Sequence, residues 1–299
     1  MIDGIINIYK EKGFTSHDVV AKMRGILKQK KIGHTGTLDP DATGVLPVCL
    51  GSGTKLCDML TDKSKEYEAV VLLGKTTDTE DVSGAVIEEK TVTASEEEIK
   101  SVIMSFMGEY MQIPPMYSAL KVNGKKLYEL ARQGIEVERK ARPVVISELT
   151  ILSMDLPRVT IRVSCSKGTY IRSLCRDMGE IIGCGACMES LVRTRVGSFL
   201  LKDAVSLKQL EENREKIEEF ITPVDACFEE YRKVYAEGRN AVLVSNGNMF
   251  RVHIADAKDS ELFRVYISDG DNGQFAGVYK FSGEKNCFLP QKMFLSGEK

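Results

Sequence analysis

The sequence predicts an α+β protein with a small β-rich unit at its C-terminal end. The chain has 299 residues, of which 43% are hydrophobic, so it is long enough for two domains with ordinary cores. Segments with helical spacing and segments with strand-like runs both occur up to about residue 233. From residue 234, short apolar segments separated by Gly, Asp and Asn turns replace them, which is typical of a small barrel. We therefore expect one domain over residues 1–233 and a second over 234–299.

The first half of the chain predicts strands and helices around one irregular loop. Residues 4–9, 45–50 and 65–74 are apolar runs of strand length. A helix is expected from the Thr15-Ser16 cap to about Lys30, because its apolar residues keep a helical period. Gly51 to Lys55 opens a further short helix, residues 76–84 form a polar loop, and the capping box at residues 95–98 begins another helix.

The second half predicts two strands at residues 144–152 and 159–165, of which the second alternates clearly. A helix follows Lys167-Gly168 and ends at Gly183, a strand returns over 193–201, and 206–220 is a polar helical stretch. The expected strands of the C-terminal unit are residues 250–254, 262–267, 273–279 and 287–289.

Composition excludes several classes of function. The apolar runs are too short to span a membrane and no signal peptide is visible, so a cytoplasmic location is expected. Eight scattered cysteines fit reduced thiols, and the pair Cys184/Cys187 lacks the second pair or histidines of a zinc site, so no metal is expected. The segment from Gly51 to Lys55 lacks the ending of a phosphate loop. A nucleotide-binding or redox protein therefore has little support.

Basic residues gather in two places although the net charge is only −2. Residues 10–31 and 121–142 each carry seven Lys or Arg side chains. Such faces can bind a phosphate backbone, although charge runs more often only solvate a surface. Residues 111–142, with Pro114-Pro115 and scattered aromatics, also look like an excursion from the core.

The loop of residues 33–47 has three glycines, two prolines and no hydrophobic period, and Asp39 lies at its bend. By itself it favours an ordinary surface loop. Arg172 lies near a helix start, where a cation opposes the helix dipole by about 0.3–1 kcal/mol, so a carboxylate partner is expected. That partner is a surface acid or Asp39, which the pairing would keep ionised. Tyr67 and Tyr170 are either packing residues or parts of the same site.

Together these segments resemble the TruB-type tRNA pseudouridine synthases. The resemblance covers about residues 4–200 in family order. Besides the loop 33–47, it is carried by Lys12-Gly13-Phe14-Thr15-Ser16, Lys65-Glu66-Tyr67, Pro114-Pro115-Met116-Tyr117-Ser118-Ala119-Leu120-Lys121, Lys167-Gly168-Thr169-Tyr170-Ile171-Arg172 and Leu191-Val192-Arg193-Thr194.

This resemblance implies a mixed, mostly antiparallel central sheet with flanking helices, and isomerisation of the T-loop uridine of tRNA (conventional position 55) without a cofactor. Asp39 would be the essential carboxylate, acting at C6, at C1′ or through a glycal route. Arg172 would pair with it, and Tyr67 would stack on the flipped-out base and help to remove the C5 proton. The substrate-binding residues implied in the same way are His34, Tyr170, Leu191, Lys12 and Thr37.

The resemblance also implies an RNA-binding thumb over residues 111–142 and a PUA-like RNA-binding domain at 234–299. The expected partner is the T-arm of tRNA, bound by a monomer without an obligate protein partner. Two alternatives stay open. One is a guide-RNA-dependent synthase of the dyskerin class, and the other is a tRNA-folding, RNA-binding protein without turnover.

Overall fold

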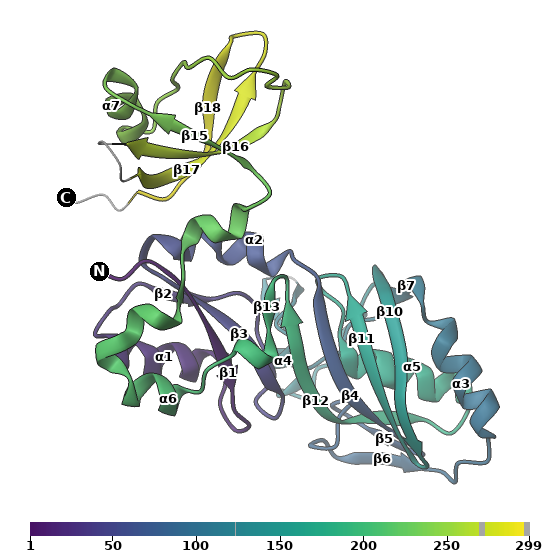
Figure 1. The fold of residues 1–299 in the computed structure, drawn as a ribbon. Helices are drawn as coiled ribbons and strands as arrows, with labels where there is room; N and C mark the ends of the chain where they lie inside the picture. The colour runs from purple at the N-terminus through teal and green to yellow at the C-terminus, as the bar shows by residue number, and fades with distance from the viewer. Residues whose placement is uncertain (123, 269–272, 296–299) are drawn as a thin grey trace.

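A ten-stranded sheet organises the computed structural model, which describes residues 1–122, 124–268 and 273–295 (Figure 1). Its strand order is β14-β1-β3-β12-β4-β11-β10-β7, with β2 beside β3 and β13 beside β12. The strands are β1 Gly4–Lys10, β2 Ile32–His34, β3 Thr43–Leu50, β4 Lys65–Leu73, β7 Gly108–Gln112, β10 Arg142–Asp155, β11 Arg158–Cys165, β12 Ala186–Val196, β13 Phe199–Leu200 and β14 Ile221–Thr222.

The two halves of this sheet join where β3 runs parallel to β12, with Arg193 opposite Gly44. The other pairs of described strands in the sheet are antiparallel, which confirms the mixed, mostly antiparallel sheet. Gly44 has φ +108°, and a Cβ atom there would lie 2.2 Å from the Arg193 carbonyl oxygen. Only glycine fits this close approach of two backbones.

Helices cover the sheet because each has one apolar face. The helix α5 (Ile171–Ile182) lies behind β10 and β11 in Figure 1, and α3 (Glu96–Ser105) lies beside β10 at the edge of the sheet. Together they bury Ile99, Leu174 and Met178 completely. Complete burial of such a side chain contributes roughly 1.5–3 kcal/mol. The helices α1 (Ser16–Leu27) and α6 (Leu207–Glu212) pack with the strands β1 and β3 in a second cluster.

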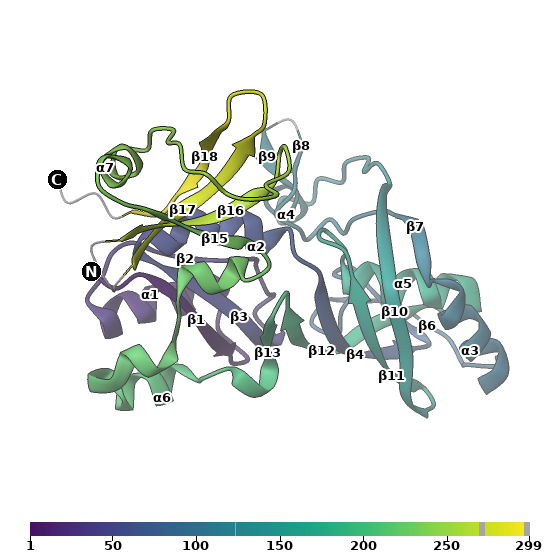
Figure 2. The same cartoon turned by 45° about the horizontal axis from the view of Figure 1, so that its top comes forward.

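Short elements connect these layers. After β3 come η1 (Gly51–Leu56) and α2 (Cys57–Thr61), and the polar loop is flanked by the hairpin of β5 (Lys75–Thr77) and β6 (Val86–Glu89). The excursion of residues 111–142 holds the hairpin β8 (Lys121–Val122) and β9 (Lys125–Lys126), followed by α4 (Leu127–Ala131). Figure 2 shows this segment beyond the end of the main sheet. Residue 123 of the predicted thumb lies outside the described residues.

The C-terminal part forms a separate four-stranded sheet of order β15-β16-β17-β18 (Figures 1 and 2). Its elements are β15 Arg232–Ala236, α7 Arg239–Ser245, β16 Leu262–Ser268, β17 Gly273–Ser282 and β18 Cys287–Met293. Val278 and Phe294 from this part pack in one cluster with Ile5 and Val45 of the main sheet. The expected β-rich unit is therefore present, while residues 269–272 and 296–299 lie outside the described part.

Several predicted elements have other bounds in the structure. The first helix ends at Leu27, because Lys28 takes a left-handed conformation with φ 49°. The strand predicted at 193–201 begins already at Ala186, since long-range pairing with β4 imposes strand structure on residues with no alternation. Residues 206–220 divide into α6 and the 3₁₀ segment η3 (Arg214–Phe220).

The strand predicted at 250–254 is wrong, since only Phe250 forms a bridge there, with Phe288. The 3₁₀ segments η2 (Leu201–Asp203) and η4 (Val224–Phe228) and the short β14 were not predicted. None of the helices in the described residues is long and apolar enough to cross a membrane.

Candidate active site

The loop of residues 33–47 is held by hydrogen bonds to the end of β1, to the turn that follows it and to the first residue of α1. The Leu38 amide donates to Ser16 Oγ at 2.9 Å. The Pro40 carbonyl accepts hydrogen bonds from the Gly13 amide at 2.9 Å and from Lys10 Nζ at 3.1 Å. Leu38 and Ala42 are buried on either side of the bend. The Asp39 side chain between them remains 42% exposed, so the loop presents one carboxylate at its surface.

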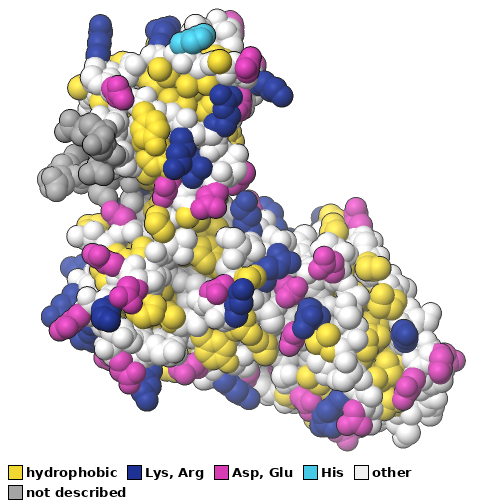
Figure 3. Space-filling model, in the orientation of Figure 1, with side chains coloured by type: hydrophobic (Ala, Val, Ile, Leu, Met, Phe, Trp, Pro, Cys, Tyr) yellow, Lys and Arg dark blue, Asp and Glu magenta, His cyan; other side chains and the backbone are white. Residues whose placement is uncertain are grey.

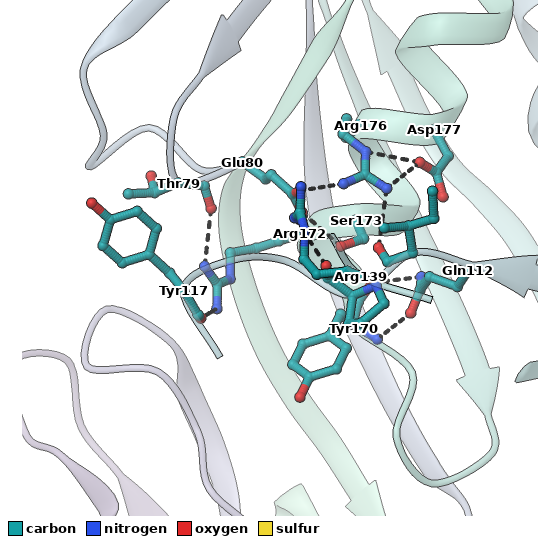
Figure 4. Close-up of polar contacts among 12 residues, drawn as sticks. Thr79, Glu80, Gln112, Tyr117, Arg139, Tyr170, Arg172, Ser173, Arg176 and Asp177 are labelled. Carbon is teal, nitrogen blue, oxygen red and sulfur yellow. Dashed lines mark hydrogen bonds and ion pairs between the residues drawn. The ribbon is translucent and has the colours of Figure 1, made fainter. Parts of the chain in front are cut away.

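Arg172 fixes this carboxylate from the second residue of α5. Its Nε lies 3.0 Å from Asp39 Oδ2, and its side chain is only 6% exposed. The remaining guanidinium nitrogens donate to the Thr79 carbonyl at 2.9 Å and to the Tyr117 carbonyl at 2.8 Å (Figure 4). Of the two partners considered for Arg172, the structure selects Asp39. A planar, forked donor with three acceptors has one orientation, so the carboxylate position is fixed as well.

Asp81 is a second carboxylate beside the Arg172 guanidinium. Its Oδ2 lies 3.7 Å from Arg172 Nη1, and the side chain is 18% exposed. The Oδ1 atom accepts hydrogen bonds from Thr79 Oγ1 at 2.8 Å and the Ser83 amide at 3.0 Å. Two carboxylates therefore flank one buried guanidinium. Asp81 was not predicted, because one acid in a polar loop carries no signal of its distant partner.

Tyr67 approaches the loop from β4. Its side chain is buried, and burial raises the pKa of its phenol, so the hydroxyl is neutral at physiological pH. The Arg193 guanidinium partly offsets this rise in the pKa of Tyr67. Arg193 is 1% exposed and also donates to the carbonyls of Val45 at 2.8 Å and Gly36 at 3.2 Å. Burial lowers the pKa of Arg193, whose described partners are carbonyl and hydroxyl oxygens rather than a carboxylate.

Two buried lysines add positive charge beside the loop. Burial lowers the pKa of Lys10 to about 8, although Asp39 and Asp41 partly offset the effect. Burial likewise lowers the pKa of Lys65 to about 8, and its ammonium group donates to the carbonyls of Thr61 and Lys63, both at 2.7 Å. Lys10 was counted in a basic surface run, but it is fully buried and cannot belong to a surface.

The other predicted residues occupy different depths around Asp39. His34 accepts a hydrogen bond from the Gly36 amide at Nδ1, and burial lowers its pKa, so the ring is neutral. Leu191 packs in the cluster that contains Leu38 and Tyr67. Thr37 is exposed. Lys12 is also exposed, and its ammonium group lies 4.0 Å from Asp41.

Tyr170 precedes α5 and is held through its backbone. The buried Gln112 accepts from the Tyr170 amide at 2.8 Å and donates to its carbonyl at 3.0 Å (Figure 4). The start of α5, and with it Arg172, is thereby fixed to β7. Sequence reasoning assigned no role to Gln112, and it named Arg193 only as part of the motif at residues 191–194. The available signal for Arg193 was its position two residues after Leu191 in the same strand, which puts a charged side chain on the inward face.

The site combines charged and neutral polar groups around the loop of residues 33–47. In the described ranges, no three His, Cys, Asp or Glu side chains gather in a way that could hold one. The site offers an oriented carboxylate, a neutral phenol and buried positive charge. Such a set suits nucleophilic or acid–base chemistry.

Comparison with known proteins identifies the family of the chain. The family profile described as TruB family pseudouridylate synthase (N terminal domain) matches residues 24–171, and that of the tRNA pseudouridylate synthase B C-terminal domain matches residues 172–229. A tRNA pseudouridine synthase B of Lachnoclostridium phytofermentans is 52% identical, covering 98% of this chain and all of the relative. The chain belongs to the TruB family of pseudouridylate synthases. The synthase is accordingly an isomerase.

Other relatives agree with this assignment. The tRNA pseudouridine synthase B of Clostridium acetobutylicum is 50% identical to the synthase over 82% of this chain and 84% of the relative. Among solved structures, a chain from an H/ACA RNP bound to a substrate RNA containing 2′-deoxyuridine superposes with a TM-score of 0.71 at 25% identity, covering 98% of the synthase and 85% of that chain. A chain from a Cbf5-Nop10-Gar1 complex gives a TM-score of 0.71 at 27% identity, with the same coverage.

Proposed function

We propose that the synthase converts the T-loop uridine of tRNA, conventional position 55, to pseudouridine, with Asp39 as the essential carboxylate. The observation that carries the proposal is the Asp39–Arg172 ion pair beside the buried Tyr67, at the positions that the family motifs assign to the reaction centre. The relatives that support the substrate are named as tRNA pseudouridine synthases.

The reaction breaks the N1–C1′ bond of uridine and joins C1′ to C5 of the same ring. C5 loses its proton, N1 gains one, and no electrons are exchanged with another molecule, so no cofactor is required. An ionised Asp39 serves as nucleophile at C6 or C1′, or as the base of a glycal route. The buried cations Lys10 and Arg193 favour anionic charge near the loop, which suits both the carboxylate and a detached uracil.

The target uridine leaves its stack to reach Asp39, which an RNA loop permits more easily than a duplex. Tyr67 stacks on the base, a contact worth roughly 1–3 kcal/mol. Its hydroxyl also relays the C5 proton, because the neutral phenol passes its own proton on as it takes this one up. Leu191 forms the apolar wall and Tyr170 supports the pocket. His34 and Thr37 contact the nucleotides around the flipped base.

The thumb of residues 111–142 holds the phosphates of the T-arm. Its Lys121, Lys125, Arg132, Lys140 and Arg142 are exposed, whereas Arg139 bonds the Pro114 carbonyl at 3.0 Å inside the segment. Lys12 contributes a further contact. On the face seen in Figure 3, Lys and Arg are interspersed with Asp and Glu, so this face offers no single-sign surface for RNA.

The unit at 234–299 acts as a PUA-like RNA-binding domain beside the catalytic domain of residues 1–233. The synthase works as a monomer without an obligate protein partner, in the cytoplasm where its tRNA substrate is found. A guide-RNA-dependent reaction is the second candidate, because one solved neighbour is a chain of an H/ACA RNP bound to a substrate RNA. Pseudouridine formation in a bare T-arm hairpin by the protein alone would exclude that candidate.

Replacement of Asp39 by Asn tests the catalytic assignment. We expect Asp39→Asn to abolish pseudouridine formation in unmodified tRNA, measured by chemical mapping, while tRNA affinity stays within about threefold. Asp41→Asn is the matched control, because Asp41 lies in the same loop with a 64% exposed side chain. Modification by Asp39→Asn would refute the role of Asp39. Binding without turnover by the unaltered protein would favour a tRNA-folding function.

A further inference from the structure

A polar cluster around the buried Glu80 lies one helical turn beyond Arg172 and takes no part in the reaction proposed above. Glu80 is 8% exposed and accepts a hydrogen bond from Ser173 Oγ at 2.6 Å. Its other carboxylate oxygen forms an ion pair with Arg176 (Figure 4). Arg176 is further bonded to Asp177 Oδ1 at 2.6 Å and to the Ile113 carbonyl at 3.1 Å. Glu180 lies 3.7 Å from it.

The backbone at Glu80 is held in an unusual conformation. Its φ is +64°, in the left-handed region that non-glycine residues rarely adopt and that costs of order 1–3 kcal/mol. Its carbonyl accepts from the Met188 amide at 3.0 Å, which fixes the segment to β12. Such a conformation persists only where the surroundings determine it, and here the contacts to α5 and β12 do so.

This conformation lets two neighbouring acids contact one helix. Glu80 contacts Ser173 and Arg176, whereas Asp81 faces Arg172 one turn earlier. On the other side, the Thr79 carbonyl accepts from Arg172 Nη1. The contacts with α5 fix the position of residues 79–81. The orientation of Arg172 depends on that position, and the orientation of Asp39 depends on Arg172.

We propose that Glu80 is a positioning residue for the isomerisation, acting with Ser173 and Arg176 to hold Thr79 and Asp81 against Arg172. This inference rests on the proposed function. Glu80 touches no reacting atom. Its effect is carried to Asp39 through Arg172, whose guanidinium turns with the loop that it bonds.

The test uses Glu80→Gly in the full-length protein, because glycine adopts φ +64° without strain, so the side chain is removed without new backbone strain. We expect the single-turnover rate of pseudouridine formation to fall on the order of 10²-fold, since displacement of a catalytic group by about 1 Å has that effect. Affinity for tRNA should remain within threefold. The milder Glu80→Gln retains an acceptor for Ser173 and should lose less. Glu88→Gln is the control, with a 51% exposed side chain on the adjacent β6.

A double-mutant comparison separates positioning from general stability. If Glu80 acts through Asp81, the rate losses of Glu80→Gly and Asp81→Asn overlap, and the double variant is less impaired than the product of both. The proposal is overturned if the rate loss of the double variant equals the product of the two single losses. A lower tRNA affinity of Glu80→Gly with an unchanged rate also overturns it. So does a wild-type rate in folded Glu80→Gly, or in Glu80→Gln if the glycine variant does not fold. Lack of activity in the unaltered protein would instead refute the proposed function.

Discussion

Replacement of Arg172 by Lys is the most direct test of how the site orients its carboxylate. A lysine keeps the positive charge beside Asp39, but its single ammonium group cannot bond Asp39 and the carbonyls of Thr79 and Tyr117 together. These acceptors lie 3.0, 2.9 and 2.8 Å from three different nitrogens of the guanidinium. The variant therefore separates charge from orientation.

The size of the effect follows from the hydrogen bonds that a lysine cannot form. Hydrogen bonds from a charged donor contribute about 1.5–3 kcal/mol each, so removal of two amounts to about 3–6 kcal/mol. If half of this is removed from the transition state, the rate falls about 10–100-fold, since about 1.4 kcal/mol corresponds to a factor of ten. The remainder should appear as a lower free energy of unfolding.

Release of tritium from tRNA labelled at uridine C5 measures this rate, because C5 loses its hydrogen in the reaction. Arg162→Lys is the matched control. Arg162 is 47% exposed and bonds Glu68, which alternates with Tyr67 along β4 and so lies on the opposite face of the sheet. An Arg172→Lys variant with the wild-type rate would show that charge alone suffices and would refute the orientation argument.

Three further predictions concern Tyr67, Gly44 and Lys10. Tyr67→Phe keeps the stacking ring but loses the hydroxyl, so turnover should fall at least tenfold while tRNA affinity, measured by filter binding, stays within threefold. Gly44→Ala should lower the free energy of unfolding in urea by about 2–5 kcal/mol, from backbone strain and overlap with Arg193. The pKa of Lys10 is lowered to about 8 in the folded protein, so between pH 8 and 10 the unfolded chain binds more protons. The free energy of unfolding, compared with that of Lys10→Met, should therefore rise with pH across this window.

Each of these predictions has a control and an opposing outcome. Loss of affinity in Tyr67→Phe would place the hydroxyl in binding rather than turnover. Gly25→Ala, in open space on α1, should stabilise the protein by about 0.5–1 kcal/mol, and equal destabilisation of both glycine variants would contradict the steric argument. A difference between wild type and Lys10→Met that is constant from pH 8 to 10 would show that Lys10 keeps its ordinary pKa.

Local sequence determined much of the fold. Helix caps and periodic apolar faces placed α1, α3 and α5, since an amphipathic stretch has one face that must be buried. Alternation placed β11, whereas β12 was predicted too short because its first half takes strand structure only from pairing with β4. The irregular loop around Asp39 was visible because its glycines and prolines interrupt every periodic pattern.

The assembly of the site was decided by tertiary structure. Sequence alone indicated Asp39, Tyr67 and Arg172, and left open whether Arg172 pairs with Asp39 or with a surface acid. Only the folded chain brings Asp81 and Glu80 to α5, and only burial by β3 and the loop makes Arg193 a partner of Tyr67. A local pattern records which face of a segment is buried. It does not record which distant group will lie 3 Å from a given nitrogen, because that distance depends on how the sheet places its strands and helices.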